Sequence, residues 1–193
     1  DIEDEAQTVT VIVPEIKTEA STDGKKETTI GGEITIEDIV SYHNLTPGKE
    51  YVVKGTLMNK TTGKPVTVND EPVTAEAAFT PETRDGEVKA TFTFNSYVIT
   101  ETTDVVVFES LYREEIEIAV HADIEDEGQS VTVYVPEIKT TASIDGKKEI
   151  TTAGKVTIED VVSYTNLIPG TEYTIRGTLM NKATGEVFTL SLI

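Results

Sequence analysis

The residues that decide the fold are an alternating run in the first quarter of the chain, Ile34-Thr35-Ile36-Glu37-Asp38-Ile39-Val40-Ser41-Tyr42. In a β-strand, side chains two positions apart point to the same face, so the run predicts one strand with an apolar face. Asp38 lies in phase with the apolar residues at positions 34, 36, 40 and 42. The run therefore predicts a sheet with one buried face and a carboxyl group on that face.

Similar runs continue along the chain, and dipeptides typical of tight turns separate them. The runs are Thr8–Val13, Ile16–Ser21, Tyr51–Met58, Lys89–Phe94, Asp104–Leu111, Glu115–Val120 and Ser130–Val135. The turn dipeptides are Asp23-Gly24, Pro47-Gly48, Thr62-Gly63 and Asp85-Gly86. No segment keeps a helical period over about ten residues. The sequence therefore predicts an all-β fold made of tandem immunoglobulin-like antiparallel β-sandwich domains.

The chain also repeats itself. Residues 1–71 match residues 123–193 without a gap, at an offset of 122 and with 46 identities in 71 pairs. We expect residues 1–12 to be the last strand of a preceding repeat, 13–135 one complete repeat, and 136–193 the opening half of the next repeat. Because the first residue is not Met, we expect the chain to be a piece of a longer protein.

Composition excludes several classes of function. The 193 residues carry 35 Asp and Glu against 16 Lys and Arg, a formal net charge of −19, so we expect no nucleic-acid binding, which needs a basic face. There is no cysteine, and therefore no disulfide or thiolate metal site. No apolar run approaches the roughly 20 residues that span a bilayer, so we expect no membrane span in this fragment.

Four polar residues share the apolar face of their predicted strands: Thr18, Asp38, Glu109 and Gln129. An unpaired buried carboxylate is costly, so Asp38 and Glu109 are expected to have partners or to share one proton. His121 is different, because simple alternation places it on the face opposite the apolar residues 116 and 118. A bulge within the acidic residues 123–128 would be needed to turn it inward.

Three motifs place these residues in a fixed order: Lys17-Thr18-x-Ala20, Val105-Val106-Val107-Phe108-Glu109, and His-x-Asp-x-x-Asp-x-x-Gln from His121 to Gln129. Together they resemble the VaFE-type repeat domains of Gram-positive bacterial surface adhesins. In that family a Thr on the first strand and a Gln on the last strand form an intramolecular ester bond. The resemblance covers the whole of residues 13–135.

The resemblance implies a role for each residue of the complete repeat. Thr18 would be the nucleophile, Gln129 the acyl donor and His121 the group that handles protons, with Asp38 and Glu109 as a supporting carboxyl pair. Each site would react once, so the domain would modify itself rather than act as an enzyme. No metal or other cofactor is implied.

The resemblance extends to the flanking repeats and to the biology. Thr140 and Asp160 would belong to the site of the next repeat, and Gln7 to that of the preceding one. The chain would be a stalk segment, with neighbouring repeats of the same chain as its partners. It would lie outside the cell, anchored to the wall of a Gram-positive bacterium, and hold out a distal domain that binds a host or environmental ligand.

Three other interpretations remain open at this point. A lysine-based isopeptide domain would need an inward Lys and a C-terminal Asn, whereas Lys17 is predicted to face solvent. A non-covalent ligand- or calcium-binding module would use the acidic residues 123–127, although their spacing fits no EF-hand loop. A hydrolase would use Thr18, His121 and Asp38 on an external ester or amide.

Overall fold

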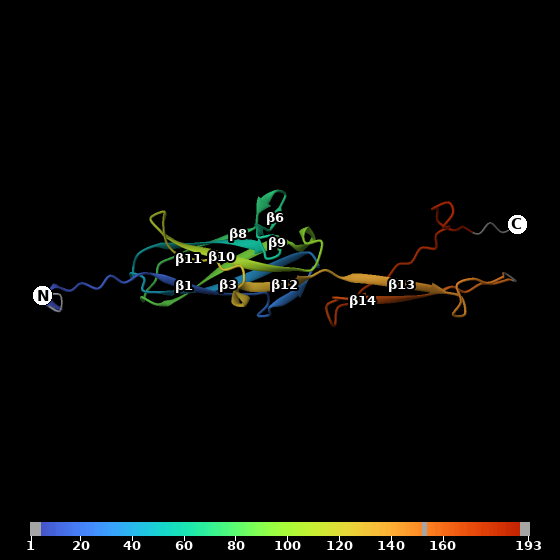
Figure 1. The fold of residues 1–193 in the computed structure, drawn as a ribbon, viewed down its shortest axis with the longest axis horizontal. Helices are drawn as coiled ribbons and strands as arrows, with labels where there is room; N and C mark the ends of the chain where they lie inside the picture. The colour runs from blue at the N-terminus through green and yellow to red at the C-terminus, as the bar shows by residue number, and fades with distance from the viewer. Residues whose placement is uncertain (1–4, 152–153, 190–193) are drawn as a thin grey trace.

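The computed structural model describes residues 5–151 and 154–189, and its extended elements are all β-strands (Figure 1). The strands are β1 (Glu15–Ser21), β2 (Glu27–Thr29), β3 (Glu33–His43), β4 (Tyr51–Asn59), β5 (Lys64–Pro65), β6 (Thr67–Val68), β7 (Glu71–Pro72), β8 (Thr74–Phe79), β9 (Gly86–Asn95), β10 (Thr103–Arg113), β11 (Ile116–His121), β12 (Ser130–Tyr134), β13 (Glu137–Ser143) and β14 (Glu159–Thr165). Three single 3₁₀ turns join them: η1 (Glu5–Gln7), η2 (Ser96–Val98) and η3 (Glu127–Gln129).

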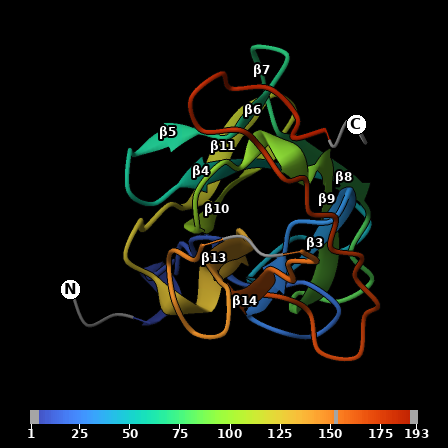
Figure 2. The ribbon, with the colours of Figure 1, turned by 90° about the vertical axis from the view of Figure 1, so that its right-hand side faces the viewer.

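Two large sheets build the complete repeat, and β6 and β7 form a separate two-stranded sheet. The smaller has the order β1-β3-β9, and the larger has the order β2-β12-β10-β4-β5, with β11 also paired to β10 and β8 to β4. All these pairs are antiparallel except β2 with β12. Figure 2 looks along the long axis and shows β3 and β9 on one side of the repeat and β4 and β10 on the other. The first and last strands, β1 and β12, therefore belong to different sheets.

The apolar faces of both sheets meet in one core. β1 and β3 alternate between buried and more exposed residues as the sequence pattern predicts, and β10 does so except at Val106, which is buried on the other face. The largest apolar side chains that are almost fully buried come from both sheets and from the loop after β3: Tyr51, Phe92, Ile36, Leu45, Leu57 and Leu111. Because the core is shared, a polar group on either inner face lies between the sheets, out of contact with water.

One edge of β10 is shared by two partners. Residues Thr103–Val106 of β10 pair with β12, and residues Glu109–Arg113 pair with β11. Between these two pairings the chain leaves the sheet and returns, through residues 122–129 and the 3₁₀ turn η3. The interruption places His121, before the loop, and Gln129, after it, beside the same part of β10.

A bulge turns His121 toward the core, but not where the sequence suggested it. The register of β10 on β11 shifts between Leu111 and Tyr112, so that Ile118 is an extra residue on β11. After the shift His121 lies opposite Glu109, while Val120 points outward and is 57% exposed. The expected bulge within residues 123–128 was therefore wrong. The β-hairpin itself reverses the alternation before the acidic loop begins.

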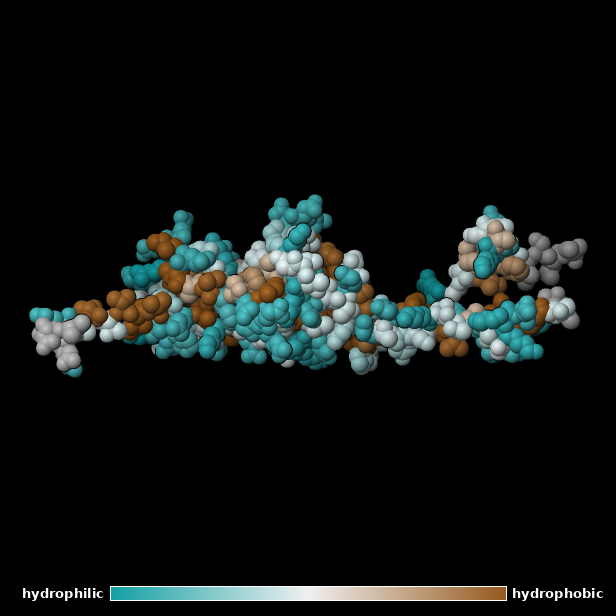
Figure 3. Space-filling model, viewed as in Figure 1, coloured by the Kyte–Doolittle hydropathy of each residue, from teal (hydrophilic) through white to brown (hydrophobic). Residues whose placement is uncertain are grey.

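Two features differ from what the sequence predicts: the strand at residues 8–13 and the tight turn at residues 85–86. Residues 8–13 lie in no strand, and Val9 and Val11 are more than 80% exposed, because no described strand pairs with them. In Figure 3, hydrophobic residues (brown) are visible along the N-terminal segment at the left. Asp85-Gly86 is a bend rather than a tight turn: Gly86 already belongs to β9, where a Cβ atom would lie 2.4 Å from the Tyr42 hydroxyl.

The following residues repeat only part of this fold. β13 and β14 pair in the same way as β1 and β3, and they lie beyond the end of the complete repeat in Figure 1. Residues 173–179, which correspond to the first part of β4, form no strand. β4 is held between β10 and β8, whose counterparts are not in this sequence. Among the described residues no helix is long and apolar enough to cross a bilayer.

Candidate cross-linking site

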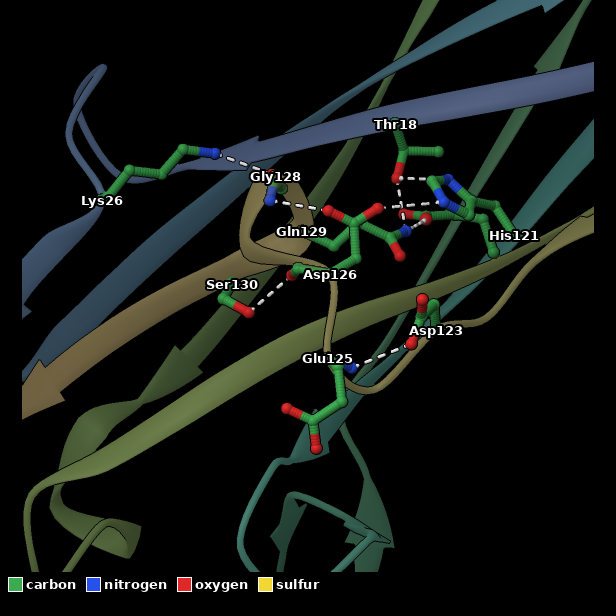
Figure 4. Close-up of polar contacts among 10 residues, drawn as sticks. Thr18, Lys26, His121, Asp123, Glu125, Asp126, Gly128, Gln129 and Ser130 are labelled. Carbon is green, nitrogen blue, oxygen red and sulfur yellow. Dashed lines mark hydrogen bonds and ion pairs between the residues drawn. The ribbon is translucent and has the colours of Figure 1, made fainter.

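Thr18 and Gln129 meet between the two sheets (Figure 4). Thr18 comes from the inner face of β1 and is 9% exposed, whereas Gln129 ends η3 and is fully buried. The Gln129 amide nitrogen Nε2 donates hydrogen bonds to Thr18 Oγ1 and to Glu109 Oε2, the latter at 3.2 Å. The hydroxyl of the first strand and the carboxamide beside the last strand are therefore in direct contact.

His121 links this pair to an acid in the loop. Its Nδ1 lies 3.4 Å from Thr18 Oγ1, and its Nε2 lies 3.1 Å from Asp126 Oδ2. Asp126 is itself held by the loop, because its Oδ1 accepts a hydrogen bond of 2.7 Å from the Gly128 amide as the N-cap of η3. An acid that accepts from Nε2 leaves Nδ1 free to accept a proton from the Thr18 hydroxyl. Asp126 stands in the sequence motif, but its contact with His121 depends on the path of the loop and was not predicted.

Asp38 and Glu109 lie on the inner faces of opposite sheets, with 0% and 1% exposure. The register places Asp38 between Ala20 and Ala90, whose small side chains leave room for the carboxyl group and offer it no side-chain hydrogen bond. Among the described residues, no N–H or O–H group makes a well-formed hydrogen bond to either Asp38 oxygen or to Glu109 Oε1. A proton held between the two carboxyl groups supplies the missing donor.

The pKa values of Asp38 and Glu109 also indicate that the pair shares one proton. Burial, followed by the hydrogen bond and the charge of Asp38, raises the pKa of Glu109 to about 10. Burial also raises the pKa of Asp38, although the hydrogen bond from Glu109 and the positive charges of His121 and Lys26 oppose this shift. Glu109 is therefore the protonated member at neutral pH and donates to Asp38, as two buried carboxyl groups with one proton should.

A close contact behind Glu109 depends on Gly55. Gly55 lies opposite Glu109 in the register of β4 on β10. A Cβ atom there would lie 2.5 Å from Cζ of Phe92 and 3.5 Å from Glu109 Oε1. Glycine thus lets the Phe92 ring close the apolar wall beside the carboxyl pair, which strengthens the desolvation that raises both pKa values.

Lys26 fixes the loop that carries Gln129 to the strand that carries Thr18. Its ammonium donates 2.6 Å to the Ala20 carbonyl of β1 and 2.7 Å to the Gly128 carbonyl of η3. Lys26 is thus a positioning residue that sequence reasoning missed. The sequence gives only a weak indication of this role: Lys26 recurs as Lys148 in the next repeat, and recurrence alone does not show what a residue contacts.

The other expected site residues remain apart. Thr140 and Asp160 are exposed, and the residues that would match Glu109, His121 and Gln129 in that repeat are not in the sequence. Gln7 is exposed in η1, which has the same 3₁₀ form as η3 but no core to enter. The second strand pair therefore shows that local sequence sets the strands, whereas burial of the site needs the opposite sheet.

Two of the alternative interpretations depend on Lys17 and on the acidic loop 123–127. Lys17 is exposed on β1, as the alternation predicts. In the acidic loop, Asp123 Oδ1 accepts from the Glu125 amide at 3.0 Å and Asp126 contacts His121. Within residues 5–151 and 154–189, no three His, Asp or Glu side chains gather closely enough to hold a metal ion.

Comparison with known folds agrees with this architecture. Two crystal forms of a bacterial adhesin from Mobiluncus mulieris, which contains intramolecular disulfide, isopeptide and ester bond cross-links, are similar to the chain. One has a TM-score of 0.54 at 16% identity, covering 80% of this chain and 76% of the adhesin. The other has a TM-score of 0.53 at 17% identity, with 80% and 77% covered. At such identity the likeness concerns the fold alone.

The sequence comparison is more specific. No curated protein sequence is similar enough to this chain to count as a relative. A family model described as the T-Q ester bond containing domain matches residues 14–133 and matches again at residues 136–189. These two matches cover most of the 193 residues, and the first contains the buried Thr18–Gln129 pair. The chain belongs to the family of T-Q ester bond containing domains.

Proposed function

We propose that Thr18 and Gln129 form an ester bond inside the complete repeat, without any other protein. The observation that carries the proposal is the buried contact between Thr18 Oγ1 and the Gln129 carboxamide, with His121 Nδ1 3.4 Å from the same oxygen. The nucleophile Thr18 thus contacts its base His121, and His121 contacts Asp126, the acid that orients it. The five residues expected from the sequence and Asp126 make up the site.

The proposed reaction begins with proton transfer. His121 Nδ1 takes the proton of the Thr18 hydroxyl while Oγ1 bonds to Cδ of Gln129. Asp126 holds the other ring nitrogen and stabilises the charged imidazolium that forms. Asp126 thus has the role of the Asp in a protease triad. The difference is that the acyl group comes from Gln129 of the same chain and not from a substrate.

The carboxyl pair stabilises the oxygen that becomes negative. Gln129 Oε1 is buried and has no hydrogen-bond partner among the described residues, whereas Nε2 contacts Glu109. Turning the carboxamide about its Cγ–Cδ bond brings Oε1 to Glu109. The Glu109 proton then leaves its hydrogen bond with Asp38 and is donated to Oε1 instead. A neutral acid in a dry site is a strong donor to such an oxyanion, because little water competes.

Collapse of the tetrahedral intermediate forms the ester and releases ammonia. The bond between Cδ and Nε2 breaks, and His121 returns its proton to the departing nitrogen. The products are one ester, between Thr18 Oγ1 and Gln129 Cδ, and one molecule of ammonia. Each site reacts once, because the nucleophile and the acyl group are both consumed.

We further propose that the ester makes this chain a segment of a mechanical stalk. The repeats would be tandem immunoglobulin-like β-sandwiches on the surface of a Gram-positive bacterium, anchored to its wall and carrying a distal ligand-binding domain. Support comes from the family, from the repeated sequence and from topology. Since β1 and β12 lie in different sheets, force along the chain would otherwise pass only through non-covalent contacts between sheets.

The test is the intact mass of the purified chain. The account predicts a deficit of about 17 Da, one ammonia, relative to the mass calculated from the sequence. Thr18→Ala and Gln129→Ala should each restore the calculated mass, whereas Thr140→Ala, at the equivalent exposed position, should keep the deficit. A wild-type chain of full calculated mass after prolonged incubation would refute the proposed reaction.

A further inference from the structure

The loop that follows β14 rests on the end of the complete repeat. Thr29, which is buried, donates a hydrogen bond of 3.2 Å from its hydroxyl to the carbonyl of Asn166. A hollow of about 460 Å³ lies between the two parts, lined by Thr22 and Tyr134 on one side and by Leu167 and Ile168 on the other. The two repeats are therefore in contact beyond the peptide that joins them.

The peptide between the repeats is short, and hydrogen bonds hold both backbone polar groups of Val135. β12 ends at Tyr134 and β13 begins at Glu137, so only Val135 and Pro136 link them. The Val135 amide donates 3.1 Å to Thr102 of the complete repeat, and its carbonyl accepts 3.0 Å from Asn166 Nδ2 of the next one. The following proline restricts Val135 to extended conformations and fixes its own φ.

The same clamp occurs a second time in the chain. Asn44 Nδ2 donates 3.1 Å to the carbonyl of Val13, which also precedes a proline. Both asparagines have a positive φ, 65° for Asn44 and 61° for Asn166, a conformation that Asn adopts more easily than most residues. The geometry occurs at both copies of these residues, Val13 with Asn44 and Val135 with Asn166, so it is a feature of the repeat and not of one loop.

We propose that each repeat carries a docking surface for the next repeat of the same chain, and that the Asn clamp fixes the angle between them. The surface is the end of the complete repeat around Thr29 and Tyr134, and its occupant is the loop Asn166–Pro169. The joint is independent of the ester, because none of its residues belongs to the cross-linking site. The joint restricts the orientation of each repeat relative to the next, so the array of repeats is stiff.

Distance measurement between two spin labels tests the joint. The chain has no cysteine, so Thr91→Cys on β9 and Ser163→Cys on β14, both exposed, supply labelling sites on either side of it. We expect one narrow distance distribution in this background and a distribution at least twofold broader with Asn166→Ala. Asn44→Ala is the matched control, since it removes the same kind of clamp away from the joint and should leave the width unchanged.

A second variant separates the docking contact from the linker. Thr29→Val removes the hydroxyl that reaches Asn166 and should also broaden the distribution, while the intact mass of the same sample reports the ester separately. A broad distribution in the unmodified background, or an unchanged width with Asn166→Ala and Thr29→Val, would overturn the proposal. Broadening by Asn44→Ala equal to that by Asn166→Ala would overturn it as well.

Discussion

Removing the Thr18 hydroxyl should lower the melting temperature of the complete repeat by about 20 °C. The ester closes a loop from residue 18 to residue 129, 112 residues counting both ends. By the chain-entropy relation used for disulfides, such a loop removes about 16 cal/mol/K from the unfolded state, or roughly 5 kcal/mol at 25 °C. A repeat of about 120 residues unfolds with an entropy near 250 cal/mol/K, which converts that free energy into about 20 °C.

Thr18→Val is the variant of choice, because it keeps the β-branched shape on β1 and loses only the hydroxyl. Calorimetry would measure its melting temperature beside the wild type and Thr140→Val, which changes the equivalent exposed residue of β13 and should shift the temperature by less than about 2 °C. Thr18→Val also leaves the buried Gln129 carboxamide without the hydroxyl that accepts from its Nε2, which adds about 1 kcal/mol to the destabilisation. A drop below about 5 °C, with the mass deficit present in wild type and absent in the variant, would refute the loop-entropy reasoning.

The site permits three further predictions. In the unlinked variant Thr18→Val, the free energy of unfolding should fall as pH rises from 4.5, the ordinary pKa of a Glu side chain, toward about 10, the pKa of Glu109 in the folded state. Over this range the folded state keeps a proton that the unfolded state has lost, and urea titrations should no longer show the trend when Glu109→Gln is added. Asp126→Asn should slow ester formation, followed by mass spectrometry over time, by about 10²-fold or more, whereas Asp123→Asn, which does not touch His121, should not; equal rates would remove Asp126 from the mechanism. Lys26→Met should slow the same reaction severalfold and Lys148→Met should leave it unchanged, so a rate unaffected by Lys26→Met would contradict its positioning role.

Alternation alone located most of the inner face of the site. β1 and β3 have clear period-2 patterns, and in β10 Glu109 is in phase with Val105, Val107 and Leu111, so the burial of Thr18, Asp38 and Glu109 follows from the sequence. The short strands β2 and β5 to β8 escaped prediction. β8, with Ala at three of its six positions, owes its place to pairing with β4 rather than to local propensity.

The position of His121 could not be derived from periodicity, because it depends on an extra residue in β11. Ile118 fits the simple pattern until the register against β10 shifts, and that shift is a property of two strands together. The contacts of Asp126 and Lys26 depend likewise on the path of the loop 122–129, which no local pattern encodes. The strand pair β13–β14 makes the same point: its register repeats that of β1 and β3, yet Thr140 and Asp160 stay exposed without the opposite sheet.

Peptide mapping of the folded chain shows directly whether Thr18 and Gln129 are joined. Trypsin cleaves after Lys17, Lys25, Arg113 and Lys139, which places Thr18 in the peptide 18–25 and Gln129 in the peptide 114–139. The account predicts one species that contains both peptides joined, lighter than their sum by about 17 Da, with fragment ions that place the link at Thr18 and Gln129. Mild alkali should separate the two peptides, since an ester hydrolyses far more readily than an amide. Recovery of both peptides separately, each at its calculated mass, would contradict the account.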